Sequence, residues 1–176
     1  ALSTIHALQS RGECELLAVT ITKDNRFAAP FIDLVNTFYG RGAIPIGVVR
    51  DGKAPEDGTY LRPIVEAKLP TGNLAYPRTR QPETEFPEAV QLLRKVLTES
   101  RDGSVVLVQV GFSTNLVRLL DSKGDQLSPL PGRELAAKKC KLLSVMAGNF
   151  APMAHEKEYN VYIDGPAARK LFAEWP

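Results

Sequence analysis

The sequence has little of what marks several familiar classes of protein. It has only two cysteines, Cys14 and Cys140, in 176 residues. Two are too few for a disulfide framework, and their spacing is not that of a metal-binding motif. Both precede apolar runs, so we expect buried free thiols. No apolar run approaches the roughly 20 residues of a membrane-spanning helix, so no membrane partner is expected.

An excess of charge of one sign is also absent. The 22 Lys and Arg residues and 20 Asp and Glu residues leave a net charge of +2, with both signs scattered along the chain. A nucleic-acid-binding protein usually shows a basic stripe, so we expect no nucleic-acid partner. The hydrophobic residues (44%) suffice for one ordinary globular domain, which we take to span residues 1–176. Helical patterns adjoin both ends, so we expect this domain to be truncated at both.

Strand-like and helix-like patterns alternate along the chain. Strands are predicted at residues 15–21, 44–49, 104–110 and 141–146, and helices near residues 1–8, 28–39, 88–100, 114–120, 132–139 and 166–173. Residues 51–84 are rich in Pro and Gly and read as a long loop, which is often functional. The alternation predicts an α/β fold: a mostly parallel, Rossmann-like sheet flanked by helices.

Ligands of such sheets bind at the carboxyl ends of the strands. Four segments lie there in the predicted fold, at residues 22–25, 50–52, 111–115 and 147–149. Asp and Asn recur in them, whereas His and Cys are absent. Oxygen and amide groups suit a hard cation or a polyhydroxyl ligand better than a zinc site or a nucleophilic triad. Within this set, Asp51-Gly52 favours a turn over a place in the pocket.

Several catalytic motifs fail on closer reading. Residues 111–115 nearly match the G-x-S-x-G nucleophile elbow but lack its final Gly, so Ser113 is expected to cap the next helix. His155-Glu156 lacks the second His of a zincin motif, and His155 is interpreted as a solvated loop residue. His6, the other histidine, is interpreted as a helix residue beside the core. Glu83, Glu85 and Glu88 precede a helix and are interpreted as complements to its dipole.

One polar pair remains, Glu158 and Asn160. In an extended segment, residues i and i+2 point to the same side, so these two side chains would face adjacent hydroxyls of one sugar. The competing interpretation is an approach to a helix that carries exposed polar residues.

Several segments together resemble the inosine-uridine-preferring nucleoside hydrolase family. Residues 15–20 (E-L-L-A-V-T), ending at Asn25, resemble the family's second strand, and Thr114-Asn115-Leu116 resembles the turn after a Val-rich strand. Residues 145–149 (V-M-A-G-N), 158–161 (E-Y-N-V) and 164–168 (D-G-P-A-A) resemble the signature M-G-G…E-[FY]-N-[IV]…D-P-x-A-A. The matches follow the family order and span nearly the whole chain.

This resemblance implies a nucleoside hydrolase fold and hydrolysis of the N-glycosidic bond of ribonucleosides to free base and ribose, as in purine or pyrimidine salvage. The family holds Ca²⁺, which binds the ribose hydroxyls and a water that an Asp deprotonates. By motif, Asn25 would contact the ribose and Thr114 would offer its backbone carbonyl to Ca²⁺. Glu158 and Asn160 would hold the 5′- and 3′-hydroxyl side of the ribose, and Asn149 would join them from its loop.

The sequence departs from the family in its carboxylates. The family's N-terminal D-x-D-x-x-x-D-D cluster, which supplies the base and most metal ligands, is not in these 176 residues, nor is its later His-Asp pair. No catalytic residue is therefore assigned. We expect a hydrolase whose activity in this chain is weak or absent. One alternative is a non-catalytic ribose- or nucleoside-binding relative with an incomplete metal site, and another is a hydrolase acting on a different glycosylated substrate.

The expected partner is a small-molecule nucleoside, with association into a homo-oligomer. The expected location is the cytoplasm, and a periplasmic or secreted location stays open should a signal peptide precede these residues. The base preference stays open as well.

Overall fold

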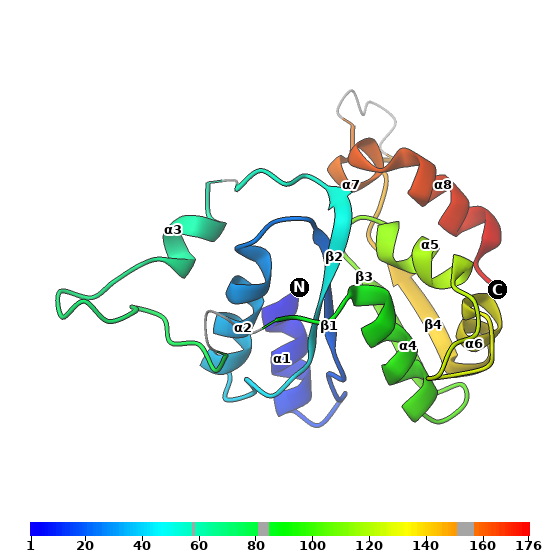
Figure 1. Ribbon diagram of the computed structural model, residues 1–176, viewed down its shortest axis with the longest axis horizontal. Helices are drawn as coiled ribbons and strands as arrows, with labels where there is room; N and C mark the ends of the chain where they lie inside the picture. Colours follow the sequence, from blue (N-terminus) through cyan, green and yellow to red (C-terminus); the bar gives the residue numbers. More distant parts are fainter. Residues whose placement is uncertain (58, 81–84, 151–156) are drawn as a thin grey trace.

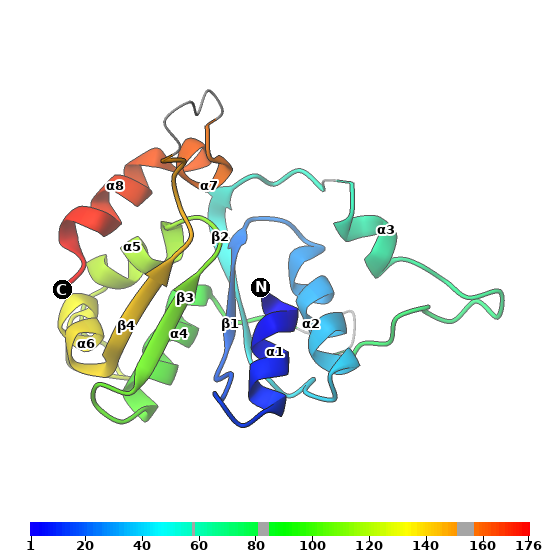
Figure 2. The same cartoon turned by 180° about the vertical axis from the view of Figure 1, so that it is seen from behind.

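The computed structural model describes residues 1–57, 59–80, 85–150 and 157–176 (Figure 1). Two pairs of parallel strands form its centre. In the first pair, β1 (Val19–Lys23) lies beside β2 (Ile46–Lys53), and in the second β3 (Val105–Gln109) lies beside β4 (Cys140–Val145). The carboxyl ends of the strands point toward the part of the molecule that carries α7 (Figure 2).

Eight helices surround the strands in the described parts of the chain. They are α1 (Leu2–Ser10), α2 (Ala28–Phe38), α3 (Leu61–Val65), α4 (Ala89–Glu99), α5 (Thr114–Asp121), α6 (Gly132–Lys139), α7 (Tyr159–Ile163) and α8 (Gly165–Glu174). The predicted α/β fold with parallel strands and flanking helices is confirmed. None of the helices in the described ranges combines the length and apolar character needed to cross a membrane.

The first strand pair encloses a small apolar core with α2 and α3. Ile21 and Ile46 come from the strands, Phe27 and Ala28 from the start of α2, and Leu61 from α3. Gly47 lets α4 approach β2 closely, since a Cβ at this position would lie 3.0 Å from the Cα of Ala89. Helix α4 packs against the first strand pair here, and it also packs against the second.

The second strand pair has the larger core. Helices α4, α5, α6 and α8 cover one of its faces with buried side chains that include Leu97, Leu119, Leu135 and Leu171. Helix α4 begins at Glu88, whose carboxylate accepts hydrogen bonds from the backbone N–H groups of Val90 and Gln91. This N-cap satisfies two donors that a helix start otherwise leaves unpaired, and it confirms the helix-start role expected of Glu88.

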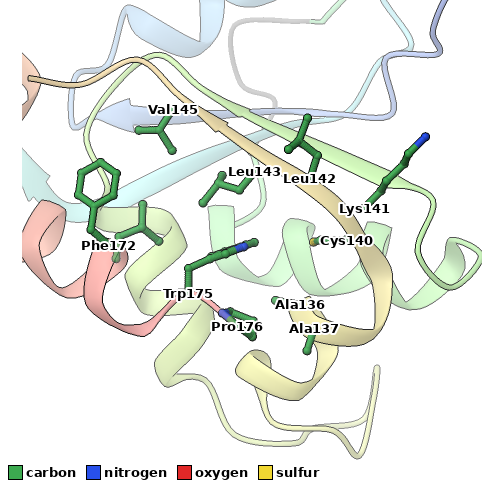
Figure 3. Close-up of a pocket in the computed structure, with 11 residues that line it drawn as sticks. Ala136, Ala137, Cys140, Lys141, Leu142, Leu143, Val145, Phe172, Trp175 and Pro176 are labelled. Atoms are coloured by element: carbon green, nitrogen blue, oxygen red, sulfur yellow. The ribbon is translucent and has the colours of Figure 1, made fainter.

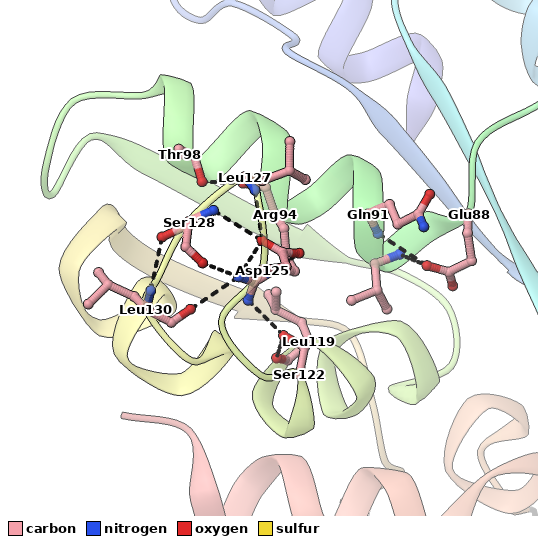
Figure 4. A network of polar contacts seen from close by, with 11 residues as sticks. Glu88, Gln91, Arg94, Thr98, Leu119, Ser122, Asp125, Leu127, Ser128 and Leu130 are labelled. Atoms are coloured by element: carbon pink, nitrogen blue, oxygen red, sulfur yellow. Dashed lines mark hydrogen bonds and ion pairs between the residues drawn. The ribbon is translucent and has the colours of Figure 1, made fainter.

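A buried arginine forms a polar centre among the helices that cover the second strand pair (Figure 4). Arg94 of α4 is 2% exposed and donates two hydrogen bonds, of 2.7 and 3.0 Å, to the carboxylate of Asp125. Its other bonds reach Ser122 Oγ and the carbonyls of Ser128 and Leu130. The guanidinium therefore fixes the loop between α5 and α6 onto α4.

The opposite face of β3 and β4 is open. Val106, Val108, Val110, Leu142 and Met146 alternate along the two strands and are 47–55% exposed. Figure 2 shows this face without a covering helix. Parallel sheets are ordinarily covered on both faces, so this open apolar surface is unusual.

The two strand pairs meet at their carboxyl ends. Asn115 Nδ2 donates to the carbonyl of Ile21, and the Phe112 N–H donates to Thr22 Oγ1. Gly111 is needed for this approach, because a Cβ there would lie 2.4 Å from Thr22 Oγ1. The strand ends of both pairs are thereby placed in one region.

Several local predictions need correction. The first strand begins at Val19 and not at residue 15, because its partner strand is preceded by Pro45, which has no N–H for further pairing. The loop predicted at residues 51–84 contains the end of β2 and helix α3. Cys14 is exposed and Cys140 half-buried, so the prediction of two buried thiols is wrong for Cys14. It lies in the turn after α1, outside any core.

The hydroxyl of Ser113 also differs from its predicted role. Ser113 is the N-cap residue of α5, but its side chain makes no cap hydrogen bond and instead accepts one from Gln109 Nε2. Burial explains the change, since the Gln109 amide inside the protein needs a partner. The predictions for Glu83 and His155 fall outside the described residues.

Candidate ligand site at the carboxyl ends of the strands

Asn25 is placed just after β1, at the start of the turn into α2. Its Nδ2 donates to the Pro55 carbonyl and to Asp57 Oδ1, and its Oδ1 accepts from the Phe27 N–H at 2.8 Å. The Asn25 side chain therefore holds its own turn and the segment after β2 together.

That neighbouring segment, residues 51–57, is strained. Asp51 and Ala54 have φ angles of 50° and 55°, a region that non-glycine residues rarely occupy. Asp24 Oδ2 accepts from the Gly52 N–H at 2.8 Å, and Arg118 of α5 donates to the carbonyl of Asp51. Asp51 and Gly52 lie within β2, where the register of its pairing with β1 shifts, so the turn predicted at these residues is wrong. Strained backbone beside strand ends is typical of functional sites.

Glu158 caps α7 and ties it to the loop after β4. Its carboxylate accepts from the backbone N–H groups of Asn160, Val161 and Gly148 at 2.9 to 3.1 Å. Burial raises the pKa of Glu158, but these three hydrogen bonds outweigh it, so the pKa lies below its ordinary value. The side chain is an anion at neutral pH.

The extended geometry considered for Glu158 and Asn160 is wrong. Asn160 lies in the first turn of α7, and its Nδ2 is 3.8 Å from Met146 Sδ. The structure supports the competing interpretation of a helix approach, because the Glu158 carboxylate bonds the free N–H groups of the helix start. The carboxylate and the amide still occupy the same end of α7.

Thr114 is the first residue of α5 and is buried. Its hydroxyl donates to Asp164 Oδ2, which lies between α7 and α8 and is also buried. A carbonyl in the first turn of a helix ordinarily accepts an intrahelical hydrogen bond, so the metal role predicted for the Thr114 carbonyl stays a prediction. Asn149 follows Gly148, whose N–H is bonded by Glu158.

Glu56 connects the Asn25 side of the site with the Glu158 side. Its carboxylate pairs with Lys23 Nζ at 2.7 Å, and Tyr159 Oη lies 3.4 Å from the same oxygen. The Tyr159 ring packs against Phe112, with 5.9 Å between ring centroids. The structure thus places Asn25, Thr114, Glu158 and Asn160 at one end of the strands, where the side chains of Asn25, Thr114 and Glu158 are already hydrogen-bonded within the protein.

Sequence reasoning gave no role to three polar residues of this region, Glu56, Tyr159 and Asp164, whereas Asp24 lies in the segment 22–25 that it nominated. Asp164 lies inside the D-G-P-A-A segment and Tyr159 inside the E-Y-N segment, so the motif itself pointed to them. Nothing in the sequence distinguishes Glu56, because it pairs with Lys23 across 33 positions.

The described residues do not fit a calcium ion. No group of three His, Cys, Asp or Glu residues in the described ranges is arranged to hold a metal. Ca²⁺ takes six to eight oxygen ligands. The carboxylates nearest the strand ends are already used, Asp24 by Gly52, Glu158 by three N–H groups and Asp164 by Thr114.

Two hollows of the molecule lie elsewhere. One of about 570 Å³ is bounded by β4, α6 and α8 and is lined by apolar side chains that include Leu143, Phe172 and Trp175 (Figure 3). Another, of about 780 Å³, runs along α4 beside Leu17 and Leu127. Neither includes a predicted site residue, so the candidate site rests on the strand-end contacts and not on a cavity.

The parallel strands, the flanking helices and the polar strand ends form an α/β fold that is similar to the fold of a solved nucleoside hydrolase. A solved structure described as a plant nucleoside hydrolase, the PpNRh1 enzyme, matches the chain with a TM-score of 0.61 and 22% sequence identity. The match covers 97% of this chain and 52% of that one, so this chain spans about half the length of that structure. No protein-family model and no curated protein sequence matches.

Proposed function

We propose that this chain provides the ribose-binding part of a nucleoside hydrolase, an enzyme that cleaves the N-glycosidic bond of ribonucleosides. The observation that carries the proposal is the position of Asn25, Thr114, Glu158 and Asn160 at one end of the strands, in a nucleoside hydrolase-like fold. Assignment to the inosine-uridine-preferring family, with its role in salvage, forms part of this proposal and rests on the motif resemblance.

Glu158 is the residue best suited to a hydroxyl-rich ligand. It is an anion at neutral pH, and a carboxylate accepts roughly four hydrogen bonds, of which the backbone uses three. Among the contacts of the described residues, one acceptor position therefore remains for a ribose hydroxyl. Asn160, one residue into α7, would contribute an amide beside it. Both groups hold and orient the sugar in this proposal, and neither is assigned a catalytic step.

Calcium would supply an activated water in an enzyme of this class. Because the described donor set does not fit the ion, we derive no step through it, and the chain on its own is expected to hydrolyse nucleosides weakly or not at all. The same observation favours a second candidate, a protein that binds a ribonucleoside without cleaving it. The proposed partner is in either case a small-molecule nucleoside.

Two assays on the same protein separate these candidates. Release of ribose from inosine, uridine, adenosine and cytidine is measured with Ca²⁺ and with chelator, and calorimetry measures binding of the same nucleosides. Release that chelator abolishes supports the hydrolase. Binding without release supports the binding protein. If the protein neither binds nor hydrolyses nucleosides at millimolar concentration, both candidates are contradicted.

Substitution of Glu158 tests the role in nucleoside binding that is proposed for this residue. Glu158→Gln keeps a capping oxygen but removes the charge, and loss of a charge-assisted hydrogen bond worth about 1.5–3 kcal/mol should weaken nucleoside binding roughly 10- to 150-fold. Glu99→Gln, at an exposed position at the end of α4, is the matched control. Equal affinities of the two variants would remove Glu158 from the site.

A further inference from the structure

Helix α1 has one fully buried side chain, His6, which is 0% exposed. The imidazole stacks on Tyr39 at the end of α2, with 4.5 Å between ring centroids and 12° between ring planes. Its Nε2 lies 2.9 Å from Asn36 Oδ1 of α2. The attachment of α1 to the rest of the molecule is therefore centred on this single ring.

The neighbours of His6 determine which ring nitrogen carries the proton. Arg41 Nη1 lies 3.2 Å from Nδ1, and a guanidinium can only donate. Nδ1 must therefore be the unprotonated acceptor. The proton then sits on Nε2 and is donated to Asn36 Oδ1, which leaves Asn36 Nδ2 as a buried group without a hydrogen-bond partner in the described structure. The contacts accommodate only the neutral imidazole.

A second proton would have no acceptor. It would sit on Nδ1, facing the N–H groups of Arg41, which also donates to the His6 carbonyl and to Ser10 Oγ. The groups that face the ring are Asn36 of α2, and Tyr39 and Arg41, which follow α2. Ser10 of α1 contacts Arg41 and the His6 carbonyl. Within the described residues, none of the contacts of His6 is a carboxylate that would balance the charge.

We propose that His6 is an acid-sensitive latch that holds α1 on α2 while it is neutral and releases α1 when it is protonated. Released α1 would uncover Asn36, Tyr39 and the adjoining surface of α2. The proposal concerns a conformational device in the fold and does not depend on the nucleoside hydrolase activity.

The direction of the pH effect follows from the surroundings of the ring. Burial lowers the pKa of His6 from its ordinary value of 6.5, the Asn36 hydrogen bond opposes this, and Arg41 adds to it. The unfolded or detached state therefore binds the proton more tightly. The stabilisation is fully present above about pH 6.5 and is lost as the pH falls below that value.

Hydrogen exchange tests the latch directly. The protection of amides in residues 5–10, corrected for intrinsic exchange, is measured between pH 7.5 and 4.5 and compared with α4. We expect protection in α1 to fall at least tenfold more than in α4. NMR titration of the two histidines, with His155→Gln to assign them, should give a pKa for His6 below 6.5.

Two variants test whether protonation of His6 is what releases α1. His6→Phe retains the stack on Tyr39 but cannot be protonated, so protection of α1 should no longer depend on pH. Arg41→Gln removes the opposing charge, so the pKa of His6 should rise and the pH effect should shrink. Arg11→Gln, at an exposed neighbouring arginine, is the control and should behave as the original chain. Acid release that persists in His6→Phe would overturn the latch.

Discussion

In the described residues, the β1–β2 half and the β3–β4 half of the molecule each contain one arginine–aspartate pair. The aspartate is the buried partner in the first pair and the arginine in the second. In the β3–β4 half, Arg94 is 2% exposed and its partner Asp125 is 39% exposed. In the β1–β2 half, Asp33 of α2 is 1% exposed and its partner Arg80 is 21% exposed. Both arginines also donate to backbone carbonyls, Arg80 to those of Gly42 and Ile44.

The comparison shows that an ion pair here is a way of fixing a connecting segment to a helix. Arg94 reaches out from α4 to the loop between α5 and α6, whereas Arg80 reaches in from a long connection to α2. The partner that is buried has to be fully hydrogen-bonded, because an unpaired charge inside the protein is strongly unfavourable. Among the described residues Arg94 donates five hydrogen bonds and Asp33 accepts two, so removal of the buried member should be felt most where that member is the cation.

Arg94→Met should have the largest effect. The methionine fills part of the space but leaves the carbonyls of Ser128 and Leu130 without the Arg94 donor, and Asp125 keeps only its hydrogen bonds from the backbone of Leu127 and Ser128. Asp125 is 39% exposed and can turn to water, so the loss comes mainly from the two loop carbonyls and the lost attachment of the loop, and we expect about 2–4 kcal/mol. Urea unfolding measures the loss, with Lys95→Met on the exposed side of α4 as control. A loss below that of the control would refute the structural role of the guanidinium.

Asp33→Ala should come next. The change removes the acceptor of the Arg80 backbone N–H at 2.9 Å and of its guanidinium at 3.3 Å. Arg80 is partly exposed and can turn to water, so we expect a loss of about 1–3 kcal/mol, smaller than for Arg94. Unfolding in urea gives the value, and Asp121→Ala, in an exposed pair with Lys170, is the control. If Asp33→Ala proves more harmful than Arg94→Met, the argument from burial of the cation is wrong.

Acid should weaken the β3–β4 half through Asp125. The hydrogen bonds from Arg94, with those from the backbone of Ser128 and Leu127, lower the pKa of Asp125 to about 2. The native state thus releases this proton more readily than the unfolded chain, so its stabilisation is present above about pH 3.8 and lost as the pH falls toward 2. Unfolding in urea from pH 6 to pH 2.5 should show the loss, and Asp125→Asn should lack that part of the pH dependence.

Val108→Ser should have the smallest effect on stability. Val108 stands on the open face of β3 and is 50% exposed, so little packing is lost, and a change within about 0.5–1 kcal/mol is expected. Val105→Ser, on the buried face of the same strand, should be far more destabilising. Thermal unfolding of the two variants checks the contrast. Equal losses would mean that the open face is covered in solution.

Periodicity predicted most of the fold. The apolar spacing at Leu93 and Leu97 identified α4, and the run of valines from residue 105 identified β3. The same reasoning could not show that Arg94, one position from Leu93, is also buried. A charged residue counts against burial in any pattern, and its partners lie 28 to 36 positions away.

The candidate site was predicted as a set of residues but not as a geometry. The motif named Glu158 and Asn160 as ribose contacts, which stays a prediction, and the structure places both beside the segment that follows β4. The motif did not show that Glu158 would cap α7, because a five-residue helix leaves almost no periodic signal in a sequence. The link from Lys23 through Glu56 to Tyr159 joins residues 23, 56 and 159, and only the folded chain brings them together.

The sequence by itself determined the alternation of strands and helices, the position of the polar strand ends and the resemblance that points to nucleosides. These depend on local spacing and on residue type, which a chain carries before it folds. Tertiary structure decided the rest: which carboxylates remain available, which charge is buried and which face of β3 and β4 stays open. Those properties follow from contacts between distant segments, whose energies depend on burial and on hydrogen-bond partners that local sequence does not specify.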